Sequence, residues 1–148
     1  MSASPGWRRL GRFESSLGIA SMIVHCSLWK FKDQVSSTQI DDIVRGYRDL
    51  GAKIPGVRAI QVGRDCRGLA GNHDIAALIF FDDIEGYQAY VDNQDHLDYA
   101  FGVLIPNIEG LDKRAAVQFE IPEEMAELIS AMAMPKEPDR GYEGQGAG

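Results

Sequence analysis

The run Asp74-Ile-Ala-Ala-Leu-Ile-Phe-Phe81 decides the fold, because it is apolar at almost every position. A short run that is apolar on both faces is typical of a strand buried within a sheet. Alternation indicates a second strand over Met22–Phe31. Its face toward the predicted helices carries Ile23, His25, Ser27, Trp29 and Phe31, and its other face carries Val24, Cys26, Leu28 and Lys30.

The segment between these strands predicts a helix followed by a strand. Ser36-Ser-Thr-Gln39 fits a capping box, and Gly51 is expected to end the helix. Apolar side chains follow the box at helical spacing: Ile40, Ile43, Val44 and Tyr47. Ile54-Pro-Gly56 then turns the chain into a strand over Val57–Gly63, and a polar loop runs from Arg64 to His73.

The segment after Phe81 predicts two more helices and a last strand. Asp82-Asp83 is expected to cap a helix that carries Ile84, Tyr87, Tyr90 and Val91. Asp95 is expected to cap a further helix that carries Leu97, Ala100, Phe101, Leu104 and Ile105, with Phe101 in the core. Alternation over Ala116–Ile121 predicts the closing strand. The order β-α-β-β-α-β predicts an α+β, ferredoxin-like antiparallel sheet with helices on one face.

Composition limits the classes of function. The 148 residues suffice for one domain with its own core, and 22 acidic against 15 basic residues leave a net charge of −7. An acidic chain lacks the positive field that nucleic acid requires, so no nucleic-acid partner is expected. No apolar run is long enough for a signal peptide or a membrane span, and no membrane partner is expected. Two cysteines, Cys26 and Cys66, indicate free thiols in the cytoplasm, with a single bridge left open.

The two ends of the chain differ from the middle. Residues 1–21 are rich in Gly, Ser and Arg, so they form either a flexible leader or a segment that is not translated, with Met22 as the true start. The predicted domain spans residues 22–121. Residues 122–148 predict a short amphipathic helix, from Pro122 to about Met134, and then a disordered acidic tail.

The two apolar faces of the central strands predict a homodimer. Helices cover one face of such a sheet, and the other should be polar if it meets water. It instead carries four large apolar side chains, whose exposure would leave roughly 6–12 kcal/mol of burial unrealised: Val24, Leu28, Leu78 and Phe80. A second copy stacked on this face would bury them. The alternative is that the C-terminal helix of the same chain covers it.

Several motifs together resemble the Dabb domain, the stress-responsive dimeric α/β barrel. They are Met22-Ile-Val-His-Cys-Ser-Leu-Trp-Lys-Phe-Lys32, Ile54-Pro-Gly-Val57, Phe81-Asp-Asp-Ile-Glu-Gly-Tyr-Gln-Ala-Tyr-Val91 and His96. The resemblance covers about residues 22–121 and implies a homodimer whose sheets close into a barrel. Some members resemble plant polyketide cyclases, which close a linear polyketide to an aromatic acid without a cofactor.

The resemblance to those cyclases implies catalytic roles for Tyr90, His96 and His25, and a pocket role for Tyr47. The chain departs from the family at Asn93-Gln-Asp-His96, where members often read His-Pro-x-His. The final His is kept, but the loop that orients it differs.

The residue types themselves point to proton-transfer chemistry. A histidine can act as a general base near neutral pH, and a tyrosine hydroxyl can donate to an enolate oxygen. His25 lies among apolar neighbours and needs a hydrogen-bond partner, for which Tyr90, Tyr47 and His96 are candidates. Apolar walls would shape a small apolar or aromatic substrate: Trp29, Ile43, Ala77, Ile79 and Tyr99. The competing interpretation is a structural histidine beside a stabilising tyrosine.

Three functions therefore remain open at this level. The first is a cofactor-free polyketide cyclase or lyase that uses a His/Tyr acid–base pair. The second is a non-catalytic stress-associated dimer, and the third is a cofactor-independent monooxygenase of small aromatics. No spacing such as HExxH supports a metal site, so neither a metal nor a cofactor is expected.

Overall fold

The computed structural model describes residues 21–125 and residue 128. Four strands form one antiparallel sheet in the order β2-β3-β1-β4. They are β1 (Ser21–Trp29), β2 (Val57–Arg64), β3 (Ile75–Phe81) and β4 (Ala115–Pro122). The chain order and the pairing confirm the predicted α+β, ferredoxin-like fold, with the almost continuously apolar β3 and the alternating β1 at the centre.

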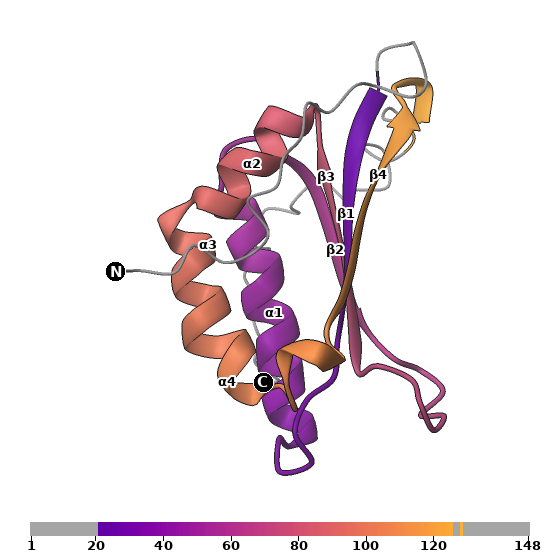
Figure 1. Cartoon of the computed structure of the whole chain (residues 1–148), viewed down its shortest axis with the longest axis vertical. Helices are drawn as coiled ribbons and strands as arrows, with labels where there is room; N and C mark the ends of the chain where they lie inside the picture. Colours follow the sequence, from indigo (N-terminus) through magenta and orange to yellow (C-terminus); the bar gives the residue numbers. More distant parts are fainter. Residues whose placement is uncertain (1–20, 126–127, 129–148) are drawn as a thin grey trace, which may run out of the picture.

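The helices cover one face of this sheet (Figure 1). They are α1 (Ser37–Lys53), α2 (Ile84–Asp92), α3 (Gln94–Tyr99) and α4 (Ile105–Asn107). A π-helical turn, η1 (Ala100–Leu104), joins α3 to α4, and a 3-10 turn, η2 (Leu111–Lys113), precedes β4. We call this side of the sheet the helix-side face and the opposite side the outer face.

Strand register decides which side chains share each face. Val24 lies opposite Phe80 on β3 and Phe119 on β4, so these three side chains belong to the outer face. His25 lies opposite Ile79 and Gln118, which puts all three on the helix-side face. Cys26 is on the outer face, so the prediction that it points away from His25 is confirmed.

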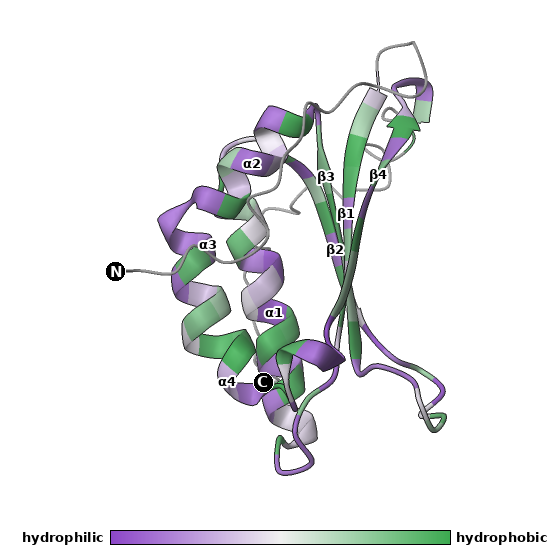
Figure 2. Cartoon of the chain, viewed as in Figure 1, coloured by the Kyte–Doolittle hydropathy of each residue, from purple (hydrophilic) through white to green (hydrophobic). Residues whose placement is uncertain are grey.

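The main core lies between the helix-side face and the helices, and hydrophobic residues run along the central strands (Figure 2). Its fully buried members include Ile75, Ala77, Ile79 and Phe81 of β3, each at most 2% exposed. The predicted stripe of α1 packs against them, because Ile40, Ile43, Val44 and Tyr47 are all buried.

The four apolar side chains predicted to be exposed on the outer face of a single chain are partly or fully buried. Val24 and Phe80 are only 2% and 8% exposed in the single chain, and they form a second cluster with Met22 and Ala59. Leu28 and Leu78 are half-buried. The exposed apolar side chains of this face lie instead on the edge strand β4, where Val117 is 54% and Phe119 44% exposed.

The start of α1 agrees with the prediction from the sequence, but its end does not. Ser36 Oγ accepts from Gln39 N and Gln39 Oε1 accepts from Ser36 N, so the predicted capping box is confirmed. Gly51 does not end the helix, which continues to Lys53. Pro55 restricts Ile54 to an extended backbone and stops the helix there, while Gly51 lies against the side chain of Ile60.

The predicted N-cap of α2 is confirmed, and that of α3 is wrong. Asp83 Oδ1 accepts from Gly86 N at the start of α2, as predicted. The residue that caps α3 is Asn93, whose Oδ1 accepts from Asp95 N, because the helix begins two residues earlier than predicted. Phe101 is 57% exposed and not in the core, since the wide π-helical turn changes the angular spacing of the side chains after Ala100.

Most of the predicted leader and tail lie outside the described residues. Ser21 already belongs to β1, and β4 continues one residue beyond the predicted domain, to Pro122. Of the predicted C-terminal helix, Glu124, Met125 and Leu128 are helical, and the last two side chains are largely exposed. No helix within the described residues is long and apolar enough to cross a membrane.

Candidate functional site

The polar and aromatic side chains predicted to act together come close to one another beneath the helices. His25 stands on β1, Tyr90 on α2 and His96 on α3. The ring centroids of Tyr90 and His96 are 4.4 Å apart, and those of His25 and Tyr90 are 6.4 Å apart. Tyr87 is also on α2, and its ring centroid lies 5.3 Å from that of His25. We call His25, Tyr87, Tyr90 and His96 the interior site.

His25 is 5% exposed, and its hydrogen-bond partner is one the sequence did not suggest. Gln118 Nε2 on β4 donates to His25 Nδ1 at 2.7 Å, whereas the predicted partners were Tyr90, Tyr47 and His96. The neutral ring therefore carries its proton on Nε2. Burial, and then the positive charge of Arg114 and the neighbouring His96, lower the pKa of His25 from 6.5 to about 4.

His96 has the opposite tautomer. Its Nδ1 lies 3.1 Å from the carbonyl oxygen of Val91, and because a carbonyl only accepts, Nδ1 carries the proton. Nε2 is then the basic nitrogen of the ring. Burial lowers the pKa of His96, against the opposing effect of the Val91 carbonyl, so the ring is a neutral base at neutral pH.

Tyr90 is fully buried, and its hydroxyl has no hydrogen-bond partner. Burial, and then the nearby Tyr47, raise its pKa, so the hydroxyl stays protonated and can donate. The hydroxyl of Tyr47 lies 3.5 Å from Ser27 Oγ, which accepts from Trp29 Nε1 at 3.1 Å. Burial raises the pKa of Tyr47 as well, against the hydrogen bond to Ser27. The Tyr90 hydroxyl thus interacts with that of Tyr47 without a hydrogen bond of normal geometry, and it can still donate to a ligand oxygen.

Arg114, which the sequence analysis did not single out, borders the interior site. Its guanidinium carbon lies 4.9 Å from the ring centroid of Trp29, and its Nε is buried without a hydrogen-bond partner. Its positive charge lowers the pKa of both His25 and His96. Arginine with unused donors next to aromatic rings is typical of sites that bind anions. Its place could not be read from the sequence, because it depends on how β4 pairs with β1.

The residues predicted to line a substrate pocket all lie on the helix-side face or on the helices above it. Ile43, Ala77 and Ile79 are buried members of the main core, at most 5% exposed. Tyr99 is half-buried, its hydroxyl donates to Ile43 O at 2.8 Å, and burial raises its pKa to about 12. Trp29 and Tyr47 both contact Ser27 Oγ through their polar atoms.

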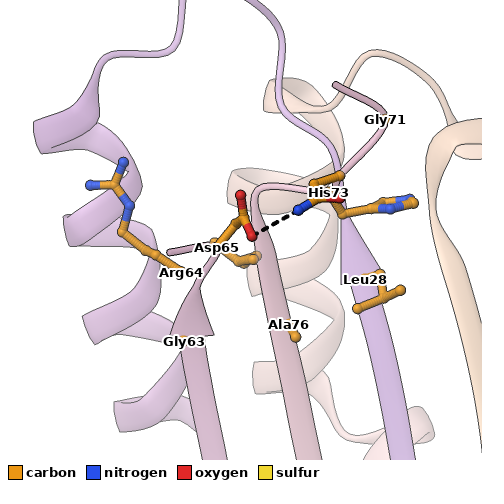
Figure 3. Close-up of a pocket in the computed structure, with 9 residues that line it drawn as sticks. Leu28, Gly63, Arg64, Asp65, Gly71, His73 and Ala76 are labelled. Carbon is orange, nitrogen blue, oxygen red and sulfur yellow. Dashed lines mark hydrogen bonds between the residues drawn. The ribbon is translucent and has the colours of Figure 1, made fainter. Parts of the chain in front are cut away.

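Two pockets open at the surface, and only the second includes a residue that borders the interior site. One, of about 450 Å³, lies where the 65–73 loop meets the outer face, and Figure 3 shows Arg64, Asp65 and His73 around it. Asn72 Nδ2 donates to Asp65 Oδ1 at 3.1 Å within this loop. The other pocket, of about 350 Å³, is lined by basic residues, by two acidic residues and by a histidine: Lys30, Lys113, Arg114, Glu109, Asp112 and His73. His73 is half-buried, and its Nε2 lies 2.8 Å from the carbonyl oxygen of Lys113.

Thiols and metal ligands are scarce around these groups. Cys26 is half-buried on the outer face, and Cys66 is exposed in the 65–73 loop; both are free thiols. Over residues 21–125 and residue 128, no group of three or more His, Cys, Asp or Glu side chains is arranged to hold a metal ion.

Comparison with known proteins gives a family and a set of similar folds. Residues 23–121 match the family Dabb, described as the stress responsive A/B barrel domain. A dimeric ferredoxin-like protein of unknown function from Thermobifida fusca is 29% identical and has a TM-score of 0.60. That match covers 74% of this chain and 100% of the other. No protein of curated function matches the sequence.

Two further structures share the fold at lower identity. A Dabb family protein from Mesorhizobium loti is 20% identical, with a TM-score of 0.58, and the match covers 69% of this chain and 97% of the other. A hydroxynitrile lyase from Passiflora edulis is 21% identical, with a TM-score of 0.61, and the match covers 70% of this chain and 96% of the other. At these identities the likeness extends to the fold alone.

Proposed function

This chain belongs to the Dabb family, the stress responsive A/B barrel domain, and from that premise we propose that it binds and converts a small apolar or aromatic carbonyl compound between its helices and its sheet. The reaction class is that of a cofactor-free cyclase or lyase. The observation that carries the proposal is the buried group of His25, Tyr90 and His96, in which one imidazole nitrogen is basic and one hydroxyl has no partner.

The working assembly in this proposal is a homodimer that stacks its two outer faces. Val117 and Phe119 leave exposed apolar surface on that face, and half-buried Leu28 and Leu78 adjoin it. The similar protein from Thermobifida fusca is described as dimeric. Stacking the outer faces would close a barrel and leave each interior site within its own protomer. Free thiols at Cys26 and Cys66 support a reducing, cytoplasmic compartment.

The proposed mechanism begins with proton abstraction. His96 Nε2 takes a proton from the carbon next to the substrate carbonyl; the electron pair of that C–H bond forms the C=C bond of the enolate, and the π pair of the carbonyl moves to its oxygen. The Tyr90 hydroxyl donates to the enolate oxygen that forms. In a cyclase, the enolate carbon then attacks a second carbonyl of the same molecule, and the imidazolium returns the proton to the new alkoxide.

Deuterium exchange tests this step without knowledge of the natural substrate. An aromatic ketone with exchangeable α-protons, 4-phenyl-2-butanone, is incubated with the protein in D2O, and loss of the α-proton signal is followed by NMR. We expect exchange above the buffer rate, reduced at least 100-fold in His96→Ala. His73→Ala, which changes a histidine outside the interior site, is the matched control and should exchange like the wild type. Undiminished exchange in His96→Ala would refute the assignment of the base.

The near-complete burial of Tyr90 and Tyr47 favours a second candidate, a non-catalytic stress-associated dimer. In that case the interior polar groups serve packing and ligand sequestration. The same experiment separates the two, because the non-catalytic dimer would show only the buffer rate of exchange in the wild type.

A further inference from the structure

We propose that Arg114 is an anion-binding residue of the interior site, so that the ligand class is a small apolar or aromatic compound that carries a carboxylate. The inference rests on the proposed function and deepens it, because it names the charged group that the ligand must present.

The first step is the position of Arg114. Ser27 pairs with Ala116 and Leu28 with Ala115, so the residue before Ala115 falls on the helix-side face, beside Trp29. The contact of 4.9 Å between its guanidinium carbon and the Trp29 ring centroid agrees with that position. Trp29 Nε1 donates to Ser27 Oγ, which lies 3.5 Å from the Tyr47 hydroxyl, so Arg114 stacks on the ring at one end of this set of polar contacts.

The second step is that two hydrogen-bond donors in this interior have no acceptor. Among the described residues, two side-chain polar atoms are buried without a partner, Tyr90 Oη and Arg114 Nε. Both can donate, and both border the same interior. An unpaired buried donor destabilises the folded state, and a ligand oxygen would relieve that penalty at both points.

The third step is charge. The low pKa values of His25 and His96 leave both imidazoles neutral at neutral pH. The four ion pairs found within the described part of the chain use other basic residues: Lys30, Arg45, Arg58 and Arg64. Arg114 thus gives the interior a local positive charge in a chain of net charge −7, and a planar guanidinium is suited to a carboxylate.

The fourth step is access. Arg114 is only half-buried, and it also lines the surface pocket of about 350 Å³ next to β4. An anion can therefore reach the guanidinium from the start of β4, without crossing the packed core formed by Ala77 and Ile79.

The test compares two probes of the same shape. Benzoate carries the carboxylate, and benzamide is its neutral counterpart. Trp7→Phe leaves Trp29 as the single tryptophan, so fluorescence reports binding beside Arg114. In this background, we expect benzoate to bind at least ten-fold more tightly than benzamide. Arg114→Gln should weaken benzoate at least ten-fold and benzamide less than two-fold.

Two further variants complete the design. Arg114→Lys keeps the charge but loses the planar fork, so benzoate affinity should fall between those of the wild type and Arg114→Gln. Arg64→Gln removes a surface arginine that pairs with Asp41, and it should leave both probes unchanged.

The outcomes separate this inference from the proposed function. If benzoate does not bind, or binds no better than benzamide, the inference is wrong. If Arg114→Gln leaves benzoate unchanged while the ketone still exchanges deuterium, the inference fails and the proposed function stands. If benzoate shows the expected preference and no ketone exchange occurs, the anion site is supported and the catalytic step is refuted.

Discussion

Unpaired polar atoms are unusual in a well-packed interior, and the described part of this chain buries two of them near aromatic rings. Tyr90 Oη and Arg114 Nε lie where the helices meet β1 and β4. Buried polar groups without partners lower stability, and a bound ligand that supplies the missing partner would remove that cost. Removing one of these polar groups should therefore raise the free energy of unfolding and lower activity.

Tyr90→Phe tests this expectation directly. The change removes a buried hydroxyl without a partner and keeps the ring, so the free energy of unfolding should rise by about 1 kcal/mol while deuterium exchange falls. Urea unfolding measures the first quantity. Tyr47→Phe is the control, since the hydroxyl that it removes contacts Ser27, and its free energy of unfolding should fall by roughly 0.5 kcal/mol. A loss of stability in Tyr90→Phe would contradict this view.

The buried His25 should make stability depend on pH. Its pKa is about 4 in the folded chain and 6.5 when unperturbed, so between these values the unfolded state binds more protons. The contribution of His25 is complete above pH 6.5 and is lost as the pH falls to 4, by about 3 kcal/mol. His96, whose pKa is also lowered, acts in the same direction.

Unfolding free energies measured between pH 7 and pH 4 check this prediction. His25→Asn should flatten the curve, because it removes the group that takes up the proton on unfolding. His73→Asn, which changes a half-buried histidine outside the interior site, should keep the slope of the wild type. Equal slopes in His25→Asn and the wild type would contradict the burial argument.

At the scale of elements, a glycine sets how closely α1 approaches β2. A Cβ at Gly51 would lie 2.7 Å from Cδ1 and Cγ2 of Ile60, closer than atoms can pack. Ile60 is β-branched and sits in a strand, so its side chain has little freedom to move. Gly51 therefore permits the contact that joins α1 to the edge strand.

Gly51→Ala should lower the free energy of unfolding by about 1–2 kcal/mol, because the clash exceeds the gain in helix propensity of about 1 kcal/mol. Chemical denaturation measures this change. Gly102→Ala is the matched helical control, as no atom lies within 4 Å of its added Cβ, and it should raise stability by about 0.5–1 kcal/mol. If both variants are stabilised, the close packing of α1 on β2 is wrong.

At the scale of the whole molecule, the outer face decides whether two chains associate. Phe119 is 44% exposed on that face, in the middle of β4. Phe119→Glu should dissociate the proposed dimer, because it would bury a charge in the apolar interface. Sedimentation equilibrium should then show a 16.3 kDa species in place of twice that mass.

Phe101→Glu provides the control for this experiment. Phe101 is 57% exposed but belongs to η1, on the helix side of the sheet, so its change should leave the dimer intact. A wild type that sediments as a monomer, or a Phe119→Glu variant that remains dimeric, would refute stacking through the outer face.

The sequence by itself determined the element order, both central strands, the capping box at Ser36 and the cap at Asp83. These features follow from local periodicity and from hydrogen bonds between residues three positions apart. The resemblance of its motifs also pointed to His25, Tyr90 and His96, and the structure places these three residues close together.

Tertiary structure alone decided which hydrogen-bond partner His25 has and which charged residue lies near the site. Gln118 binds His25 across 93 positions of sequence, and Arg114 reaches Trp29 only through the pairing of β4 with β1. The burial of Val24 and Phe80, the continuation of α1 past Gly51 and the exposure of Phe101 likewise depend on neighbours or turns that no local pattern encodes. Contacts between distant segments are set by register and packing, and these are properties of the whole chain.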